Sequence, residues 1–380
     1  MTNTQVAEPE PVDRRQPNKE LKHLPRYASA ALGLRNYWYP AVLARRLRKK
    51  PLPVTMLGEE LVLVRHNGKV FCLQGRCAHR GVPLCQGKFD FPGTITCPYH
   101  GWTYELASGQ CVAALTDGPE SAVVGKVKLK TYPAQDRQGV IWVYVGDGEA
   151  PPLETDVYPE FLEEGAMVGA REFEWLGNWR LAMEGAIDPS HPFYLHRMSW
   201  LAQPYSFIAS RGRHWPEIVD NRYLTYRTDP PVPESEYPGL GRWPRQVWWR
   251  RKHLNKLLVY GALPCSSMVA HLNFNEPFVT YSWYVPVDAS HYRWFTFLVA
   301  PAKVRGVKRW WAWLKYWGWL RWTYQGQFLR QDSWMNEIMH PFYDEQNGWT
   351  KERLYRPDVV LTAWRRFIEK EARGIQEYPH

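Results

Sequence analysis

Two short metal-ligand motifs constrain this chain more than any other feature of its sequence. Cys77 and His79 form a Cys-x-His motif, and Cys97 and His100 form a Cys-x-x-His motif after seventeen intervening residues. Two thiolates and two imidazoles can hold a tetrahedral zinc ion. They can also hold a two-iron, two-sulfide cluster, with both cysteines on one iron and both histidines on the other. In either case two loops must meet at one metal centre.

Strand-forming sequence surrounds both motifs. LVLVRHNGKVFCL (61–73) places two β-rich runs around Asn67-Gly68, a dipeptide typical of hairpin turns. Further short strands are expected at 94–97, 102–106, 128–132 and 140–145. The spacing of these strands and turns predicts a small all-β domain.

The length of 380 residues predicts about two domains. The Pro-Pro pair at 151–152 is a plausible boundary, so we expect a tail and lead-in at 1–35, an all-β domain at 36–150 and a second domain at 151–380. The elements expected in the second domain are helices at 180–185, 191–200 and 359–372, strands at 269–272, 279–287 and 293–299, and a Pro-rich loop at 229–245. The fold class predicted is therefore α+β.

His191 and His196 are the only histidine pair in their segment, and the residues alone leave open whether the pair is structural or binds a second metal. Five residues correspond to about 140° of rotation on an ideal helix, so the two rings would not share a helix face. Pro192 also interrupts a helix at this point. The two imidazoles can converge only where the chain is locally distorted.

If the two histidines bind a metal ion as part of a 2-His-1-carboxylate face, a carboxylate must come from far along the chain. Apolar residues at helical spacing predict a buried stripe along one side of a helix. Its members are Trp310, Trp313, Leu314, Trp317, Leu320, Tyr324 and Phe328. Asp332 lies at the edge of this stripe, and a carboxylate near a core face needs a counter-charge or a metal. Asp332 is therefore the favoured third ligand, with Glu337 and Asp344 as weaker candidates.

Both sets of ligands resemble one known family. CAHRGVPL with CPYHGWTYEL resembles the Rieske motif of the non-haem iron ring-hydroxylating oxygenases, and NWRLAMEGAIDPSH…YLH resembles their iron motif. The resemblance implies that Cys77, His79, Cys97 and His100 bind a Rieske [2Fe-2S] cluster. It also implies that His191, His196 and Asp332, in QDSW (331–334), bind mononuclear iron.

The same resemblance implies a role for Asp188, three residues before His191. In the family this carboxylate hydrogen-bonds a Rieske histidine of a neighbouring subunit, which implies a homotrimer. The implied fold is an all-β Rieske domain followed by a helix-grip-like catalytic domain, an antiparallel sheet covered by helices.

The implied activity is that of a terminal oxygenase component. Mononuclear Fe(II) activates O₂ with electrons that come from NAD(P)H through a ferredoxin or a reductase. Further segments, GLRNYWYP (33–40), WYVPVD (283–288) and AWRRFIEKEARGIQ (363–376), resemble carbazole-type members of the family. The expected reaction is hydroxylation or dihydroxylation of a bulky, apolar, multi-ring substrate. A net charge of +10 suits an acidic ferredoxin near Arg80 and Lys88.

Residues 303–324 combine tryptophan with basic residues. Six Trp and six Lys or Arg occur there without an acidic residue. Such a composition is typical of a helix at a membrane surface, although the same tryptophans can instead pack on a neighbouring subunit. Membrane contact would favour the alternative function, a peripheral oxygenase that oxidises a sterol, steroid or hopanoid.

Other classes of protein are less well supported by the sequence. A pure electron carrier would need only the Rieske domain, and a zinc-stabilised binding protein would need only the first four ligands. Nucleic-acid binding is not expected, because no recognition motif accompanies the positive charge. The first twenty residues contain no apolar signal segment, and six cysteines do not suggest a disulfide framework. We therefore expect a cytoplasmic protein, peripheral to the inner face of the membrane if 303–324 touches lipid.

Overall fold

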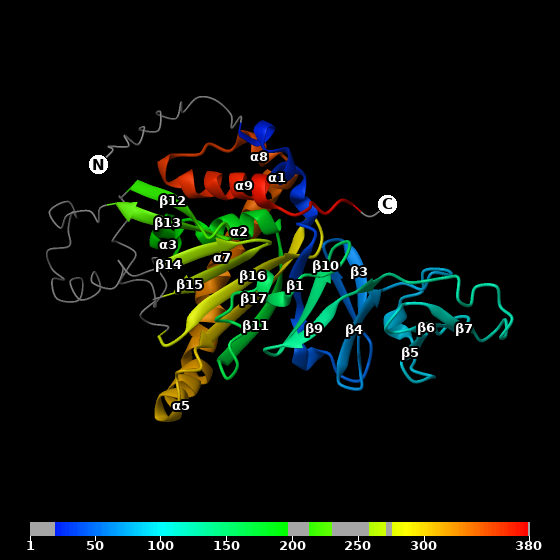
Figure 1. The fold of residues 1–380 in the computed structure, drawn as a ribbon. Helices are drawn as coiled ribbons and strands as arrows, with labels where there is room; N and C mark the ends of the chain where they lie inside the picture. The colour runs from blue at the N-terminus through cyan, green and yellow to red at the C-terminus, as the bar shows by residue number, and fades with distance from the viewer. Residues whose placement is uncertain (1–19, 197–212, 230–257, 271–275, 379–380) are drawn as a thin grey trace.

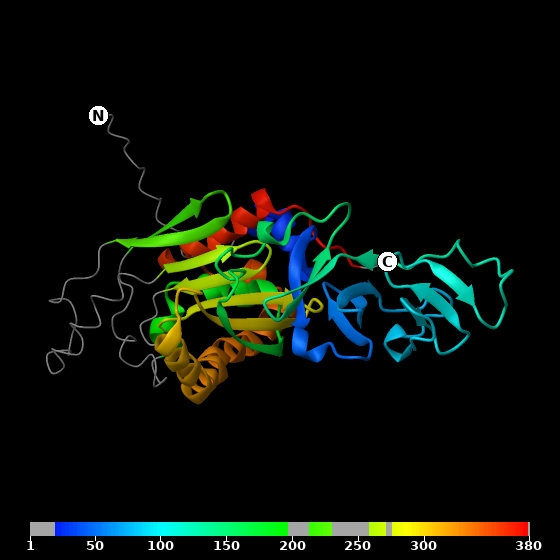
Figure 2. The same ribbon diagram turned by 60° about the horizontal axis from the view of Figure 1, so that its bottom comes forward.

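The computed structural model of the chain describes residues 20–196, 213–229, 258–270 and 276–378. A large antiparallel sheet with covering helices forms one end of the molecule, and smaller β-sheets form the other (Figure 1). The view in Figure 2 shows the same separation, with the smallest sheet farthest from the helices. The predicted α+β class, a β domain followed by a helix-covered antiparallel sheet, is confirmed.

Three small antiparallel sheets build the β end of the molecule. The four-stranded sheet consists of β2 (Leu52–Met56), β3 (Glu59–His66), β4 (Lys69–Gln74) and β8 (Thr131–Tyr132). The outermost sheet consists of β5 (Thr94–Thr96), β6 (Trp102–Glu105) and β7 (Cys111–Ala114). The third consists of β1 (Tyr37–Leu43), β10 (Val140–Val145) and β9 (Ala134–Arg137). As predicted, Asn67 and Gly68 form the turn between β3 and β4, both with positive φ.

The second domain contains a seven-stranded antiparallel sheet. In spatial order its strands are β11 (Met167–Leu176), β17 (His291–Ala300), β16 (Val279–Pro286), β15 (Ser266–Ala270), β14 (Leu258–Ala262), β13 (Tyr223–Asp229) and β12 (Arg213–Val219). β16 and β17 lie on the expected strands at 279–287 and 293–299. Residues 230–245 of the predicted Pro-rich loop lie outside the described residues.

Helices cover one face of this sheet. They are α1 (Pro25–Ser29), α2 (Trp179–Ile187), α3 (His191–Leu195), α5 (Gly306–Lys315), α6 (Arg321–Thr323), α7 (Leu329–Asp344), α8 (Gly348–Lys351) and α9 (Val359–Glu371). α2 packs on the central strands, α7 on β11 and α9 on β12 and β13. α9 matches the predicted final helix at 359–372 to within one residue.

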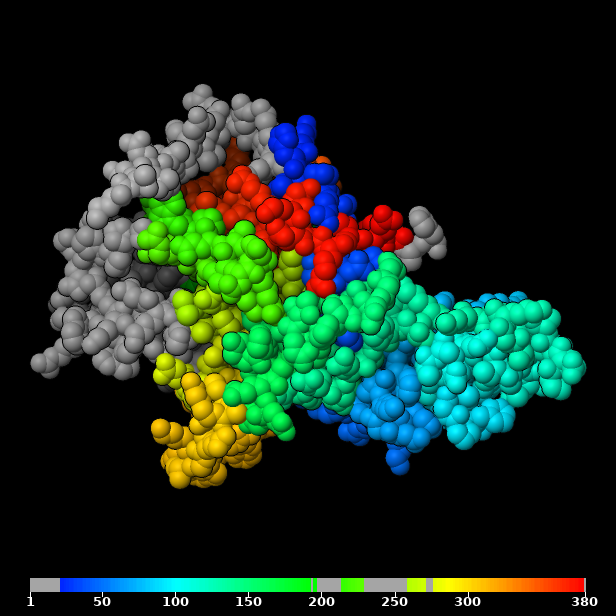
Figure 3. Space-filling view, in the orientation of Figure 1, coloured from blue at the N-terminus to red at the C-terminus, as the bar shows by residue number. Residues whose placement is uncertain are grey.

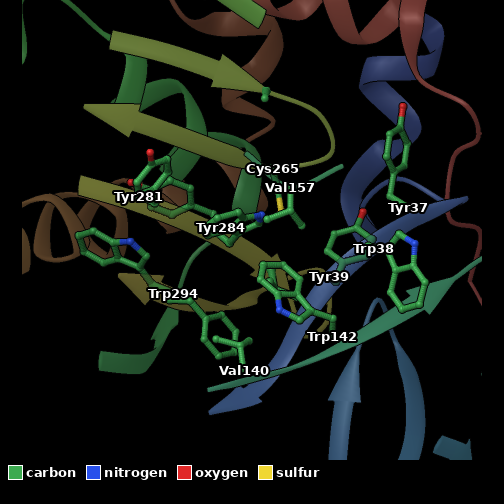
Figure 4. Close-up of a cluster of buried hydrophobic side chains, with 14 of the residues drawn as sticks. Tyr37, Trp38, Tyr39, Val140, Trp142, Val157, Cys265, Tyr281, Tyr284 and Trp294 are labelled. Carbon is green, nitrogen blue, oxygen red and sulfur yellow. The ribbon is translucent and has the colours of Figure 1, made fainter. Parts of the chain in front are cut away.

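The other face of the sheet packs on aromatic residues from the β end. Trp142 of β10 lies edge-on against Trp283 of β16, with ring centroids 5.3 Å apart. Phe161 contacts Trp283 and also Phe297 of β17. Figure 4 shows side chains of β1 and β10 beside those of the large sheet. A core of buried aromatic rings thus fixes β1 and β10 to the seven-stranded sheet.

The prediction of a buried apolar stripe from Trp310 to Phe328 is partly wrong. Leu320 and Tyr324 are buried, but Trp310, Trp313 and Trp317 are about half exposed. The buried positions instead recur every four residues, as Ala312, Tyr316, Leu320 and Tyr324.

The reason for this difference is a change in helix geometry. Four residues overshoot an α-helical turn by about 40°, so such a stripe should drift around the helix. Two π-helical turns, Tyr316–Leu320 and Tyr324–Phe328, contain more residues per turn and offset that drift. Tyr316 packs directly on Gly169 of β11, where any β-carbon would overlap its ring.

None of the helices in the described part of the chain is long and apolar enough to cross a membrane.

Candidate metal centres

Two hairpin-like loops carry the first four candidate ligands. In the first, the Gly81 amide donates to the Cys77 carbonyl at 2.9 Å, and in the second the Gly101 amide donates to the Cys97 carbonyl at 3.1 Å. Both glycines have φ near +70°, which residues with a β-carbon rarely adopt. The loops therefore close in the same way and place Cys77 and Cys97 at equivalent positions.

The two loops meet with their cysteines inside and their histidines outside. Cys77 and Cys97 are both 3% exposed, and burial together with the neighbouring Cys77 thiol raises the pKa of Cys97. The rings of His79 and His100 lie with centroids 4.6 Å apart, nearer the surface. Paired cysteines below paired histidines are the arrangement that a two-iron cluster requires.

A single zinc ion fits these four residues poorly. Tetrahedral zinc needs all four ligand atoms around one point. The four loop residues do not converge in this way. In the described part of the chain, side chains that do so are those of His191, His196 and Asp332, at the second centre. The donor set of the loops therefore fits a [2Fe-2S] cluster, with its ligands in two pairs.

The second centre begins where the helix α2 ends. Asp188 is the C-cap of α2 and has extended backbone, and α3 starts at His191 with Pro192 in its first turn. The Asp188 carboxylate accepts hydrogen bonds from the backbone amides of Ser190, at 2.7 Å, and His191, at 3.1 Å. This break is the local distortion that the His191–His196 spacing requires.

The helix α7 carries the third candidate ligand, Asp332. Oδ1 of Asp332 lies 3.5 Å from Nε2 of His191 and 3.2 Å from Nε2 of His196. The ligand atoms of all three residues lie within 4.8 Å of one another. Oδ1 of Asp332 and Nδ1 of His191 are buried without a hydrogen-bond partner. Two imidazoles and a carboxylate that converge in this way fit a 2-His-1-carboxylate iron site.

The charges of this site are strongly coupled. Burial alone raises the pKa of Asp332, but His196 and His191 lower it well below its usual range. Burial alone lowers the pKa of His191, but the nearby carboxylates of Asp188 and Asp332 raise it to about 10. The two carboxylates thus favour a positive charge between these side chains, and a metal cation held by His191, His196 and Asp332 would supply it.

The weaker candidates are not part of this centre. Glu337 and Asp344 lie further along α7, outside the group formed by Asp332 and the two histidines. Asp344 lies instead 3.9 Å from Nε2 of His340.

Gln331 is a site residue that the sequence patterns did not single out as functional. Its Oε1 lies 2.7 Å from Nδ1 of His196, and the His196 ring stacks on Phe328 at a centroid distance of 3.9 Å. The amide oxygen accepts a hydrogen from Nδ1, so Nε2 is left free to face Asp332. The signal available in the sequence was only its position next to a candidate ligand.

Gln331→Leu should weaken mononuclear iron binding by roughly 10- to 100-fold, because the His196 tautomer and ring orientation are no longer fixed. Iron titration of the metal-depleted site, followed by single-turnover product formation, measures this effect. Gln327→Leu, an exposed glutamine one turn earlier, is the matched control and should bind iron normally. Normal iron affinity in Gln331→Leu would remove Gln331 from the site.

Family models cover most of the chain. A Rieske [2Fe-2S] domain matches residues 37–133, and a model described as a homotrimeric ring hydroxylase matches residues 144–213 and 259–376. The fold and the two centres thus define an iron-dependent oxidoreductase with a Rieske cluster and a non-haem iron site. The chain belongs to the Rieske ring-hydroxylating oxygenase family.

Relatives of known activity are similar over nearly the full length. The terminal oxygenase component of carbazole 1,9a-dioxygenase from Metapseudomonas resinovorans is 32% identical, over 95% of this chain and 97% of the relative. The corresponding Sphingomonas sp protein is 33% identical, over 92% and 95%. A solved reduced complex between oxygenase and ferredoxin in carbazole 1,9a-dioxygenase has a TM-score of 0.79 and 29% identity, over 96% of each chain.

Proposed function

We propose that this chain is the terminal oxygenase component of a multicomponent Rieske system. The observation that carries the proposal is the convergence of His191, His196 and Asp332 in the same chain as the paired Cys-His loops. Cys77, His79, Cys97 and His100 hold the Rieske cluster, which supplies electrons one at a time, and the second site holds the iron at which O₂ is activated. The Rieske domain spans 36–150, after a lead-in at 1–35, and the catalytic domain spans 151–380.

The proposed substrate is a bulky, apolar, multi-ring compound, polycyclic or heteroaromatic. Full-length similarity to oxygenases named for carbazole supports this class. The chain's own residues orient the iron ligands through Asp188 and Gln331. The orientation of the bound ring system then decides whether one or two oxygen atoms are inserted.

The proposed electron donor is a ferredoxin or a reductase that takes electrons from NAD(P)H. A ferredoxin is present in solved complexes of carbazole 1,9a-dioxygenase oxygenase. Here Arg80 and Lys88 are exposed beside the two cluster loops, and a net charge of +10 favours encounter with an acidic partner.

We also propose a homotrimer in which Asp188 bridges the two centres of neighbouring subunits. The family model that matches the catalytic domain describes homotrimers. Burial raises the pKa of Asp188, but hydrogen bonds from His191 and Ser190 lower it overall, so the carboxylate is charged and can accept a hydrogen from a second imidazole.

Asp188→Asn should keep both metal centres but slow electron transfer between them, because an amide has one acceptor oxygen where the carboxylate has two. Rapid-freeze EPR of the reduced cluster during a single turnover measures this rate. Asp344→Asn on the exposed side of α7 is the control. A wild-type rate in Asp188→Asn would contradict the bridging role.

The experiment that tests the proposed function is spectroscopy of the protein purified without oxygen. The expected result is a red-brown protein with a Rieske-type EPR signal after dithionite, and one iron beyond the two of the cluster. Turnover with ferredoxin and reductase is then compared for carbazole-like polycyclics and for sterols. A colourless protein that contains zinc would overturn the proposal.

A second candidate function is oxidation of a sterol, steroid or hopanoid by the same iron site. The exposed tryptophans between 303 and 324 favour it, because a substrate dissolved in a membrane would reach a peripheral enzyme. We place the protein in the cytoplasm, with this segment at the inner face of the membrane. Preferential turnover of sterols would support this candidate over the polycyclic substrates.

A further inference from the structure

Residues 306–322, hereafter the Trp helix, expose an unusual amount of apolar surface. All six of its tryptophans are 41–60% exposed, at positions Trp310, Trp311, Trp313, Trp317, Trp319 and Trp322. The segment projects from the body of the molecule in Figure 1 and forms a separate protrusion in Figure 3. Contiguous exposed apolar surface of this kind usually marks an interaction site.

The tryptophans point to several sides of the helix. At about 100° per residue, Trp310, Trp311 and Trp313 span about 160° of its circumference, on the sides away from the buried Ala312 and Tyr316. A flat protein partner would cover a narrower part of a projecting helix. Lipid headgroups can contact all of its exposed sides, and tryptophan is enriched at that depth of a bilayer.

The charge around the Trp helix has one sign. No Asp or Glu occurs between residues 289 and 331, and Lys303 and Lys308 are exposed. Lysine is depleted in the cores of subunit interfaces but is common beside tryptophan in helices that lie on membranes. The charge therefore favours an anionic lipid surface over a second copy of the chain.

Two arginines connect the Trp helix to the sheet. The guanidinium carbon of Arg321 lies 4.9 Å from the ring centroid of Trp317 and 5.9 Å from that of Trp322. Arg171 of β11 lies 5.9 Å from the Trp322 centroid and donates to the Arg321 carbonyl at 2.9 Å. Guanidinium groups stacked on indole rings remain able to donate to phosphate oxygens.

These arginines have no carboxylate partner within the described ranges. The acidic residues of β11 are already paired, Glu172 with Arg46 at 2.7 Å and Glu174 with Arg293 at 2.8 Å. Burial and the nearby charges of Arg321 and Arg330 lower the pKa of Arg171. A cluster of like charges is thus held together with no internal anion to balance it.

We propose that the Trp helix, with Arg171 and Arg321 at its base, docks on the anionic phospholipid surface of a bilayer. The tryptophan rings lie at the headgroup level, the guanidinium groups bind lipid phosphates, and Lys303 and Lys308 add electrostatic attraction. This inference rests on the proposed membrane contact and deepens it, because it names the lipid chemistry that the surface recognises.

Vesicle co-sedimentation of the holoprotein tests the proposal. Vesicles of phosphatidylcholine alone are compared with vesicles that contain 30 mol% phosphatidylglycerol. We expect at least tenfold tighter binding to the anionic vesicles, and loss of that preference in Lys303→Glu/Lys308→Glu. Lys126→Glu/Lys128→Glu makes the same change in net charge at exposed lysines of the Rieske domain and should keep the preference.

Tryptophan substitutions separate insertion from charge. Trp310→Ser/Trp311→Ser should bind both kinds of vesicle at least tenfold more weakly than wild type, whereas Trp334→Ser, which removes an equally exposed tryptophan from α7, should not. Arg321→Gln should lose the preference for phosphatidylglycerol; if it does not fold, the lysine pair still tests the proposal. Equal binding of the wild type to both vesicles would overturn the anionic-lipid inference alone.

Two further outcomes would remove the membrane contact as well. One is a wild-type protein that binds neither kind of vesicle. The other is a Trp310→Ser/Trp311→Ser variant whose trimer dissociates in light scattering, because a second copy of the chain would then cover the Trp helix.

Discussion

Asp332→Ala is expected to yield a coloured protein that retains its two cluster irons, loses the mononuclear iron and forms no product. Asp332 is the carboxylate that lies within reach of both His191 and His196. Without it, two neutral imidazoles remain, and they bind Fe(II) weakly because no anionic ligand offsets the metal charge. The cluster loops lie in the other domain, so the reduced Rieske signal should not change.

Iron analysis, EPR before and after dithionite, and turnover are measured on the same preparation. Glu337→Ala and Asp344→Ala are matched controls, because they remove the other two carboxylates of α7 that were candidates for the ligand. Both should keep the third iron. Full iron content and normal turnover in Asp332→Ala would show that another residue supplies the carboxylate.

Arg365→Met is expected to produce the largest loss of stability of any single substitution discussed. Arg365 is fully buried in α9, where Nε and Nη2 donate to Glu184 of α2 at 2.7 and 2.8 Å and Nη1 donates to Glu352. Tyr27 of α1 donates to the same Glu184 carboxylate. Four segments of the chain therefore meet at one guanidinium group.

Removal of that guanidinium leaves two carboxylates buried without their counter-charge. Breaking a buried ion pair in this way costs about 3–5 kcal/mol, which should appear as a lower urea midpoint and a lower melting temperature. Lys370→Met on the exposed side of α9 breaks only a surface pair with Glu371 and should change stability by less than about 1 kcal/mol.

A compensating variant tests the cause of the loss. Arg365→Met/Glu184→Met/Glu352→Gln removes the unpaired charges together with the guanidinium, and should recover much of the lost stability because apolar replacement of a buried ion cluster is often tolerated. If Arg365→Met alone is as stable as the wild type, the network contributes little to the fold.

Much of the architecture, and the candidate ligands of the Rieske cluster, could be predicted from local sequence patterns. The Cys-His spacing predicts all four candidate loop ligands because both members of each pair lie in one tight turn, where the distance between side chains depends on short-range geometry. β10 at Val140–Val145 and α9 near 359–372 could be predicted because a fully buried strand leaves a short continuous apolar run and an amphipathic helix leaves an apolar pattern of period about 3.6.

The iron site depended on contacts that no local pattern contains. Asp332 could be ranked above Glu337 and Asp344 from the sequence and the family resemblance, but its approach to His191 requires α7 to pack beside α2. Gln331 gains its role only because His196, 135 positions away, turns Nδ1 toward it. Such pairings result from the packing of whole helices, which a linear pattern does not specify.

The Trp helix also combines features that local sequence predicts with features that depend on packing. An apolar, basic, acid-free helix within 303–324 could be predicted, because composition and period are local properties. Which side of it is buried depends on tertiary packing: the fit of Tyr316 on Gly169 and two π-helical turns direct Ala312, Leu320 and Tyr324 inward and leave six tryptophans outside. The shape of the facing sheet, with Gly169 opposite Tyr316, decides which apolar residues of the helix are buried.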